Sequence, residues 1–232
     1  MFGRLLVLVT LTLALLLFGG AGPSQAPGRP FVPAMPLPGT PPAVPAEAAH
    51  LVDLAEYAPE LILDIRYARE DNAFEQAFYS EARALLARGT AAKLRRAADA
   101  LAEQGYLLVV WDAYRPLSVQ RAMWRKVPDP RYVADPARGS RHNRAAAVDV
   151  TLADRSGELL AMPTDFDGFG PAADLAWDQH PAEVRARAMT LRQAMREAGF
   201  LPYSAEWWHF SDKEWANYQL LDIPLDTPVP RP

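Results

Sequence analysis

The stretch YLLVVWDAYRP, residues 106–116, begins with a predicted buried β-strand over residues 106–114, because apolar, β-branched and aromatic residues dominate it. Pro116 ends this strand, since proline has no N–H to donate to a sheet. A second strand is predicted over residues 145–154, AAAVDVTLAD, and Ser156–Gly157 then marks a turn. Both strands are apolar over most of their length, which indicates a sheet that lies in the core.

Helices are predicted on either side of these strands. Residues 80–104 carry apolar residues at helical spacing, which predicts one or two helices with a break near Gly89. Residues 181–199 predict an amphipathic helix that Gly199 closes. The few strands, mixed with helices, favour an α+β fold with a small, mostly antiparallel sheet and flanking helices. A short helix is also predicted over residues 118–124, and further strands over residues 61–68 and 204–212. The residues of the amphipathic helix expected to face inward are Val184, Ala188, Leu191, Met195 and Ala198.

The segment before the domain predicts an export signal and a tether. Within residues 1–22, one arginine precedes a largely apolar run of 14 residues, and small residues follow it. That run is short for a membrane span, which needs about 20 apolar residues, and it matches a secretory signal peptide. Residues 23–45 hold nine prolines, which predicts an extended tether. The folded domain is then expected over residues 46–224, with a proline-rich tail over residues 225–232.

We therefore expect an exported protein, periplasmic or secreted, with no stable membrane span after cleavage of the signal. An uncleaved N-terminal anchor is the alternative, and the cleavage site stays open.

The composition excludes several classes of function. The 232 residues include 24 Lys and Arg against 28 Asp and Glu, a formal charge of −4, whereas nucleic-acid-binding proteins usually carry a basic patch. The chain has no cysteine, which excludes disulfides, thiol catalysis and thiolate zinc ligands. A metal site must therefore use carboxylates and the four histidines, which are His50, His142, His180 and His209.

Two segments place a histidine near a carboxylate. In SRHNRAAAVDV, His142 precedes Asp149 by seven positions, and in EWWHF, Glu206 precedes His209 by three. A catalytic zinc uses three protein ligands and keeps one position open, and His142, Asp149 and His209 supply that number. Glu206 is then left over to act as the general base for a zinc-activated water.

Each of these signals also has an ordinary structural explanation. A histidine in a loop is commonly solvated, an aspartate in a strand commonly accepts a local hydrogen bond, and paired tryptophans commonly fill a core. Arg115, which follows the strand at its end, could neutralise an oxyanion or form a surface salt bridge worth roughly 0–1 kcal/mol. His50 and His180 stand outside any ligand spacing, and we interpret both as structural or solvent-facing.

Several motifs, in the same order, resemble those of the D-alanyl-D-alanine dipeptidases, zinc peptidases that share a fold with the D,D-carboxypeptidases and the hedgehog domain. The shared pattern is Ser-x-His, an aspartate seven residues after that histidine, and Glu-x-x-His, here Ser140–His142, Asp149 and Glu206–His209. YRP (Tyr114–Pro116) and DIRYAREDN (Asp64–Asn72) also match. The resemblance covers nearly the whole expected domain.

The resemblance implies a catalytic zinc site. It implies that His142, Asp149 and His209 bind one Zn²⁺ per chain, and that Glu206 is the catalytic base. It also implies that Arg115 stabilises the tetrahedral intermediate.

The resemblance further implies a small substrate, the dipeptide D-Ala-D-Ala, which is hydrolysed to two D-alanines. Phe166–Asp167 matches the pair whose aspartate faces the substrate's free ammonium, with Asp165 as a nearby competitor. Tyr67 and Ser140 match positions that line the dipeptide site. A buried carboxylate favours a free ammonium, because an N-acylated peptide would leave that charge unpaired at a cost of several kcal/mol.

Three features depart from the family pattern. Relatives usually carry glycine three positions after the first histidine and just before the tyrosine of YRP, where this chain has Ala145 and Ala113. If either glycine serves a positive φ, alanine strains the backbone there. Well-known members act in the cytoplasm, whereas this chain carries an export signal.

Two other functions stay open from the sequence. One is a zinc D,D-carboxypeptidase that acts on peptidoglycan stem peptides, and Asp167 favours the dipeptidase over it. The other is a non-catalytic, zinc-bearing module that binds the cell wall, and the presence of both Glu206 and Arg115 argues against it. The sequence does not fix the oligomeric state.

Overall fold

The computed structural model describes residues 46–174 and 176–231, which all belong to one compact unit. The signal peptide expected over residues 1–22 and the tether expected over residues 23–45 lie outside the described residues. Within the described part of the chain, no helix is long and apolar enough to cross a membrane.

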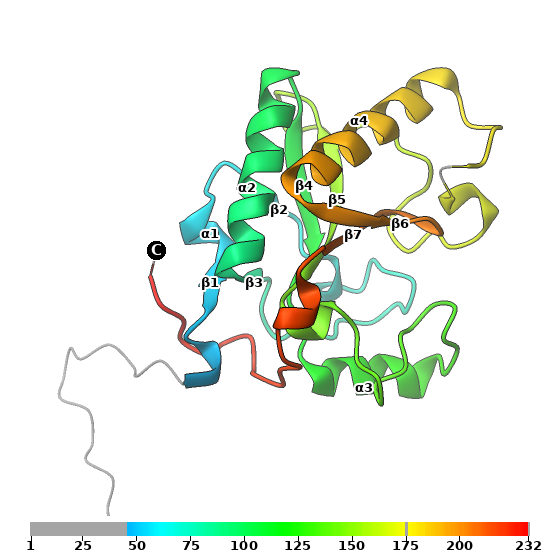
Figure 1. The fold of residues 1–232 in the computed structure, drawn as a ribbon. Coiled ribbons are helices and arrows are strands. Elements are labelled where there is room, and N and C mark those ends of the chain that lie inside the picture. The colour runs from blue at the N-terminus through cyan, green and yellow to red at the C-terminus, as the bar shows by residue number, and fades with distance from the viewer. Residues whose placement is uncertain (1–45, 175, 232) are drawn as a thin grey trace, which may run out of the picture. The chain divides into compact units, whose positions relative to one another are not determined.

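A five-stranded sheet runs through the centre of the domain (Figure 1). In spatial order its strands are β2 (Ile62–Leu63), β4 (Leu107–Asp112), β5 (Ala147–Ala153), β7 (Glu206–Asp212) and β6 (Phe200–Tyr203). Only β2 and β4 run parallel, and the other neighbouring pairs are antiparallel. The expected α+β fold with a small, mostly antiparallel sheet is confirmed.

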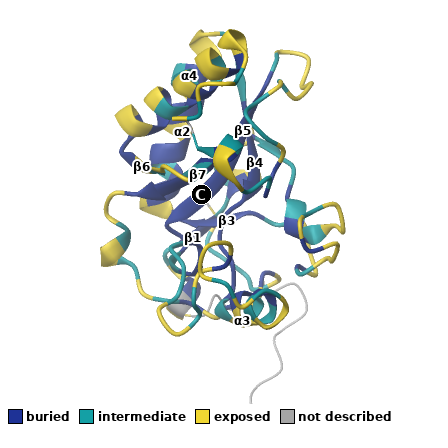
Figure 2. Ribbon diagram, turned by 90° about the vertical axis from the view of Figure 1, so that its right-hand side faces the viewer, coloured by how far each residue is buried: buried dark blue, intermediate teal, exposed yellow. Residues whose placement is uncertain are grey.

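Two long helices, α2 (Arg88–Glu103) and α4 (Ala182–Ala198), pack against each other and against the sheet. Figure 2 shows that the central strands β4, β5 and β7 are mostly buried while the outer side of α4 is exposed. The five residues of α4 expected to face inward are all buried. The smaller elements are β1 (Leu51–Asp53), α1 (Leu54–Tyr57), β3 (Leu85–Ala87), α3 (Leu117–Lys126) and the 3-10 turns Ala46–Ala48, Arg66–Ala68, His142–Arg144, Pro171–Ala173 and Trp215–Asn217.

Two expectations for the first half of the domain are wrong. Residues 85–87, expected to be helical, form β3, which pairs antiparallel with β1 and is fully buried. Packing against β1 therefore overrides the helix propensity of this Leu- and Ala-rich segment. The strand expected over residues 61–68 keeps only the two residues of β2 before the chain enters a 3-10 turn. Strand β6 was not expected, and its Pro202 is tolerated because β6 lies at the edge of the sheet.

The two alanines that replace family glycines differ in backbone conformation. Ala145 has φ 52° and ψ 33°, a left-handed conformation, and it closes the 3-10 turn that begins at His142. Its N–H donates to the carbonyl oxygen of His142 at 3.0 Å, so the strained residue lies beside a predicted metal ligand. Ala113 is not among the described residues with positive φ. The expected strain is therefore present at Ala145 and absent at Ala113.

The left-handed backbone at Ala145 predicts that Ala145→Gly stabilises the protein. Glycine adopts positive φ without steric cost, and we expect the free energy of unfolding to rise by about 1 kcal/mol, measured by urea unfolding. Ala113→Gly is the matched control and should lower it by about 0.5–1 kcal/mol, because it only adds freedom to the unfolded chain. A decrease in both variants would contradict strain at Ala145.

Candidate active site

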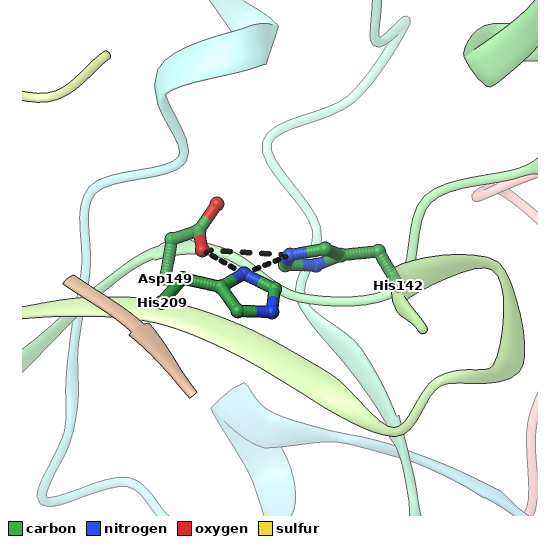
Figure 3. Close-up of side chains that lie close together, drawn as sticks. All are labelled: His142, Asp149 and His209. Atoms are coloured by element: carbon green, nitrogen blue, oxygen red, sulfur yellow. Dashed lines mark hydrogen bonds and ion pairs between the residues drawn. The ribbon is translucent and has the colours of Figure 1, made fainter. Parts of the chain in front are cut away.

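Three chain segments bring His142, Asp149 and His209 together. His142 begins a 3-10 turn, Asp149 lies on β5 and His209 lies on β7, directly opposite Asp149 in the strand register. Asp149 Oδ1 lies 2.9 Å from His209 Nδ1 and 3.4 Å from His142 Nε2, and the two nitrogens are 3.2 Å apart (Figure 3). The three ligand atoms all lie within 4.8 Å of one another, as a shared metal ion requires.

The surroundings of this cluster fit a cation. His142 Nδ1 lies 2.7 Å from the carbonyl oxygen of Ala113, which can only accept, so Nδ1 carries the proton and Nε2 keeps its lone pair. His209 Nε2 lies 3.0 Å from Ser211 Oγ, which can accept its proton and leave Nδ1 free. Two nitrogens and a carboxylate oxygen are a donor set that Zn²⁺ accepts. The residues therefore fit a zinc ion.

The pKa shifts of Asp149 and His209 also favour the protonation states that bind a cation. Burial disfavours ionisation of Asp149, but His142 and His209 outweigh it and hold the pKa of this carboxyl well below its usual range. Burial lowers the pKa of His209, which favours the neutral imidazole that binds metals. The cluster therefore presents one anion and a neutral ring to its shared centre.

Glu206, the first residue of β7, lines a cavity that His142, Asp149 and His209 also line. Burial raises its pKa to about 8, and the charges of Asp149 and Asp167 act in the same direction. A carboxylate with a pKa close to neutral is suited to take up a proton and release it again.

Arg115 is buried, so the surface salt bridge considered for it from the sequence is wrong. Its Nη2 donates to Asp112 Oδ2 at 2.7 Å and its Nη1 to Gln120 Oε1 at 3.0 Å. The other carboxylate oxygen of Asp112 accepts from the Tyr79 hydroxyl at 2.6 Å. Asp112 Oδ2 also lies 3.5 Å from His142 Nδ1, so one fully buried carboxylate supports both the arginine and a metal-ligand histidine.

This supporting set, which comprises Asp112, Tyr79 and Gln120, was not predicted from the sequence. A signal was present for Asp112, because a carboxylate that directly follows the apolar run of residues 106–111 within a predicted buried strand must have a buried partner. Tyr79 and Gln120 gave no such signal, since only the fold brings them to Arg115.

Asp167 and Tyr67 meet at another wall of the cavity. The Tyr67 hydroxyl lies 3.1 and 3.0 Å from the two carboxylate oxygens of Asp167. Burial, and secondarily the charge of Asp149, raises the pKa of Asp167 to about 7. Asp167 lines the cavity with the metal cluster, whereas Asp165 lines a separate cavity, so the two candidates for this position are distinguished.

The cavity itself has a volume of about 310 Å³, within the range of small-molecule sites. All eight residues singled out from the sequence line it, and these are Tyr67, Arg115, Ser140, His142, Asp149, Asp167, Glu206 and His209. Aromatic rings of Tyr132, Phe169 and Trp208 complete its wall. His50 and His180 do not line the cavity. The ring of His50 stacks on Tyr218, and Nε2 of His180 contacts the carbonyl oxygen of Ala172.

Comparison with known proteins gives a consistent set of relatives. A family profile described as D-Ala-D-Ala dipeptidase matches residues 47–225. The chain is 36% identical over 176 residues to the D-alanyl-D-alanine dipeptidase of Escherichia coli (strain K12), a match that covers 76% of this chain and 91% of the relative. It is 33% identical over 178 residues to the D-alanyl-D-alanine dipeptidase of Streptomyces coelicolor, covering 65% of this chain and 85% of the relative.

Two solved structures were also matched, each at 18% identity. The vancomycin resistance D,D-pentapeptidase VanY, in complex with Zn(II), gives a TM-score of 0.39 over 56% of this chain and 73% of that one. The LD-carboxypeptidase LdcB gives a TM-score of 0.42 over 79% of this chain and 77% of that one.

The raised pKa of Asp167 predicts that Asp167→Asn stabilises the metal-free protein at alkaline pH. As pH rises from the unfolded pKa of about 3.9 to the folded value of about 7, the folded wild type loses stability, and the deficit persists above that window. Asparagine avoids the deficit and still accepts from Tyr67. We expect the variant to be more stable by about 2–4 kcal/mol at pH 8 and nearly equal at pH 4, measured by urea unfolding with a chelator present.

Asp165→Asn is the matched control and should change stability little at either pH. If the wild type is at least as stable as Asp167→Asn at pH 8, ionisation of the buried Asp167 carboxyl does not destabilise the folded protein, and the prediction is wrong.

Proposed function

The chain belongs to the D-Ala-D-Ala dipeptidase family of metallopeptidases, and from that premise we propose that it hydrolyses free D-alanyl-D-alanine to two D-alanines with one Zn²⁺ per chain. The observation that carries the proposal is that a single cavity holds the histidine–aspartate cluster, Glu206, Arg115 and the Asp167–Tyr67 pair. This arrangement would supply a metal site, a base, a cation and an ammonium partner to one small substrate.

Zinc held by His142, Asp149 and His209 would lower the pKa of a water molecule and polarise the peptide carbonyl. Glu206 would take the proton of the attacking water and pass it to the nitrogen of the leaving D-alanine. Its raised pKa supports this role, because a carboxylate with a pKa close to neutral can both accept a proton and release it.

Arg115 would stabilise the negative charge that develops on the carbonyl oxygen. The position of the guanidinium supports this role. Asp112 and Gln120 accept its hydrogen bonds, and its carbon lies 4.9 Å from the centre of the Tyr67 ring. A cation fixed before the reaction loses little entropy when charge develops.

Asp167 and Tyr67 would bind the substrate's free ammonium, and Ser140 would line the dipeptide site. A buried carboxylate whose pKa is raised by burial gains from a cationic partner. An N-acylated stem peptide has no such cation, which favours the dipeptidase over a D,D-carboxypeptidase.

We also propose that the protein acts outside the cytoplasm, in the periplasm or as a secreted enzyme. The support is the signal-like pattern of residues 1–22 followed by the proline-rich residues 23–45. An exported member would meet dipeptides released from the cell wall.

Glu206→Gln tests the assignment of the general base. We expect kcat on D-Ala-D-Ala to fall by about 10²–10⁴, because the amide cannot accept the proton, while zinc content stays at one per chain. Glu103→Gln, an exposed change at the end of α2, is the control and should leave kcat unchanged. Unchanged turnover in Glu206→Gln would show that Glu206 is not the general base, whereas a wild type that binds zinc without hydrolysing D-Ala-D-Ala would favour the non-catalytic module.

Substrate selectivity tests the ammonium site. We expect kcat/KM for D-Ala-D-Ala to exceed that for N-acetyl-D-Ala-D-Ala by at least about 10³, because acylation removes the partner of Asp167. In Asp167→Asn this ratio should shrink by about a hundredfold, with Asp165→Asn as the unaffected control. Faster cleavage of the acylated substrate by the wild type would instead indicate a carboxypeptidase.

A further inference from the structure

The second ring nitrogen of His209 contacts a residue that no step of the proposed reaction uses. His209 Nε2 lies 3.0 Å from the hydroxyl oxygen of Ser211, two residues along β7. Ser211 is fully buried, and Arg141 Nη1 donates to the same oxygen at 3.1 Å. The guanidinium carbon of Arg141 lies 4.9 Å from the ring centre of Trp215. A chain of contacts therefore runs from Trp215 through Arg141 and Ser211 to His209.

The two histidines of the metal cluster are oriented by different kinds of partner. His142 presents Nε2 to the cluster, and a backbone carbonyl fixes the proton on its Nδ1. His209 presents Nδ1, and its partner is a side-chain hydroxyl, which can rotate. A 180° flip of the His209 ring would replace Nδ1 by a carbon, and only the observed orientation lets Nε2 meet Ser211. The contact with Ser211 Oγ therefore favours the ring orientation in which Nδ1 faces the cluster.

Arg141 is placed to hold that oxygen. Among the ion pairs of the described residues Arg141 has none, so its charge is not committed to a carboxylate. Its observed partners are the Trp215 ring and Ser211 Oγ. Arg144 lies over the same ring, with its guanidinium carbon 5.5 Å from the ring centre, but it donates to the carbonyl of Tyr218. The two arginines thus share a tryptophan and differ in the contact with Ser211.

We propose that Ser211 and Arg141 are positioning residues that hold His209 with Nδ1 toward the metal, and so raise the affinity of the site for Zn²⁺. The inference rests on the metal site of the proposed function and adds two residues to it. Hydrogen-bond partners of metal-bound histidines fix the ring and strengthen the ligand, and their loss commonly weakens metal binding by about 10- to 100-fold.

The experiment measures zinc affinity, which does not depend on turnover. Full-length protein is stripped of metal and titrated with Zn²⁺ against a chromophoric chelator, and the unfolding temperature of each metal-free variant is recorded. We expect Ser211→Ala to weaken zinc binding by at least about tenfold and Arg141→Met to weaken it in the same direction by less. Arg144→Met, which removes the same charge from the same tryptophan, should bind zinc like the wild type. Ser211→Thr, which keeps the hydroxyl, should restore affinity.

The outcomes separate this inference from the proposed function. If the wild type binds no zinc, the proposed function is wrong. If the wild type binds zinc and Ser211→Ala and Arg141→Met bind it equally tightly, only the positioning role is overturned. Equal losses in Arg141→Met and Arg144→Met would also overturn it, because the effect would then come from the Trp215 stack. If Ser211→Ala fails to fold, the two arginine variants still decide between these outcomes.

Discussion

The register between β5 and β7 is the constraint on which the site depends. Asp149 and His209 are direct neighbours across this antiparallel pair, so their side chains leave the same face of the sheet. A slip of one residue would turn one of them to the opposite face and leave only two of the three candidate ligands together. The same register places Glu206 at the start of β7, beside the cavity, and Ser211 behind the ring of His209.

Contacts at the far end of β7 hold this register. Asp212 is fully buried, accepts from Thr90 Oγ1 at 2.8 Å and pairs with Lys93, both on α2. Its backbone N–H also donates to the carbonyl of Ala146, just before β5. A slip of β7 would separate Asp212 from Lys93 and leave a buried charge without its partner, which typically costs 3–5 kcal/mol. The ion pair between strand and helix therefore opposes the movement that would dismantle the metal cluster.

How far the sequence predicts the molecule depends on how local each signal is. Strands β4, β5 and β7 and helix α4 carry long, continuous patterns, and the motifs shared with the dipeptidase family implied that His142, Asp149 and His209 converge. The short strands β1, β3 and β6 were missed or misassigned. Strand β6 is a four-residue edge strand that contains Pro202, so its sequence carries no strand pattern. Strands β1 and β3 exist only through pairing with each other, although they lie far apart in the sequence. The support of Arg115 by Tyr79 has the same origin, since the fold alone joins residues so far apart. The domain limits of residues 46–224 and the roles of the site residues stay predictions.

The carboxylates of the cavity carry opposite pKa shifts, and this contrast explains what the site has to bind. Asp149 has two imidazoles beside it and stays ionised, whereas burial and the neighbouring anions raise the pKa of Glu206 to about 8 and of Asp167 to about 7. Asp167 also adopts a left-handed backbone with φ 56°, so its placement is unfavourable in both conformation and charge. A cation beside each acid offsets this cost, and a dication at the cluster and an ammonium at Asp167 are the two that suit the positions. The proposed selectivity for a free amino terminus and the proposed affinity for metal would therefore arise from one cause, which is that the fold buries more acidic groups here than it pairs with cations.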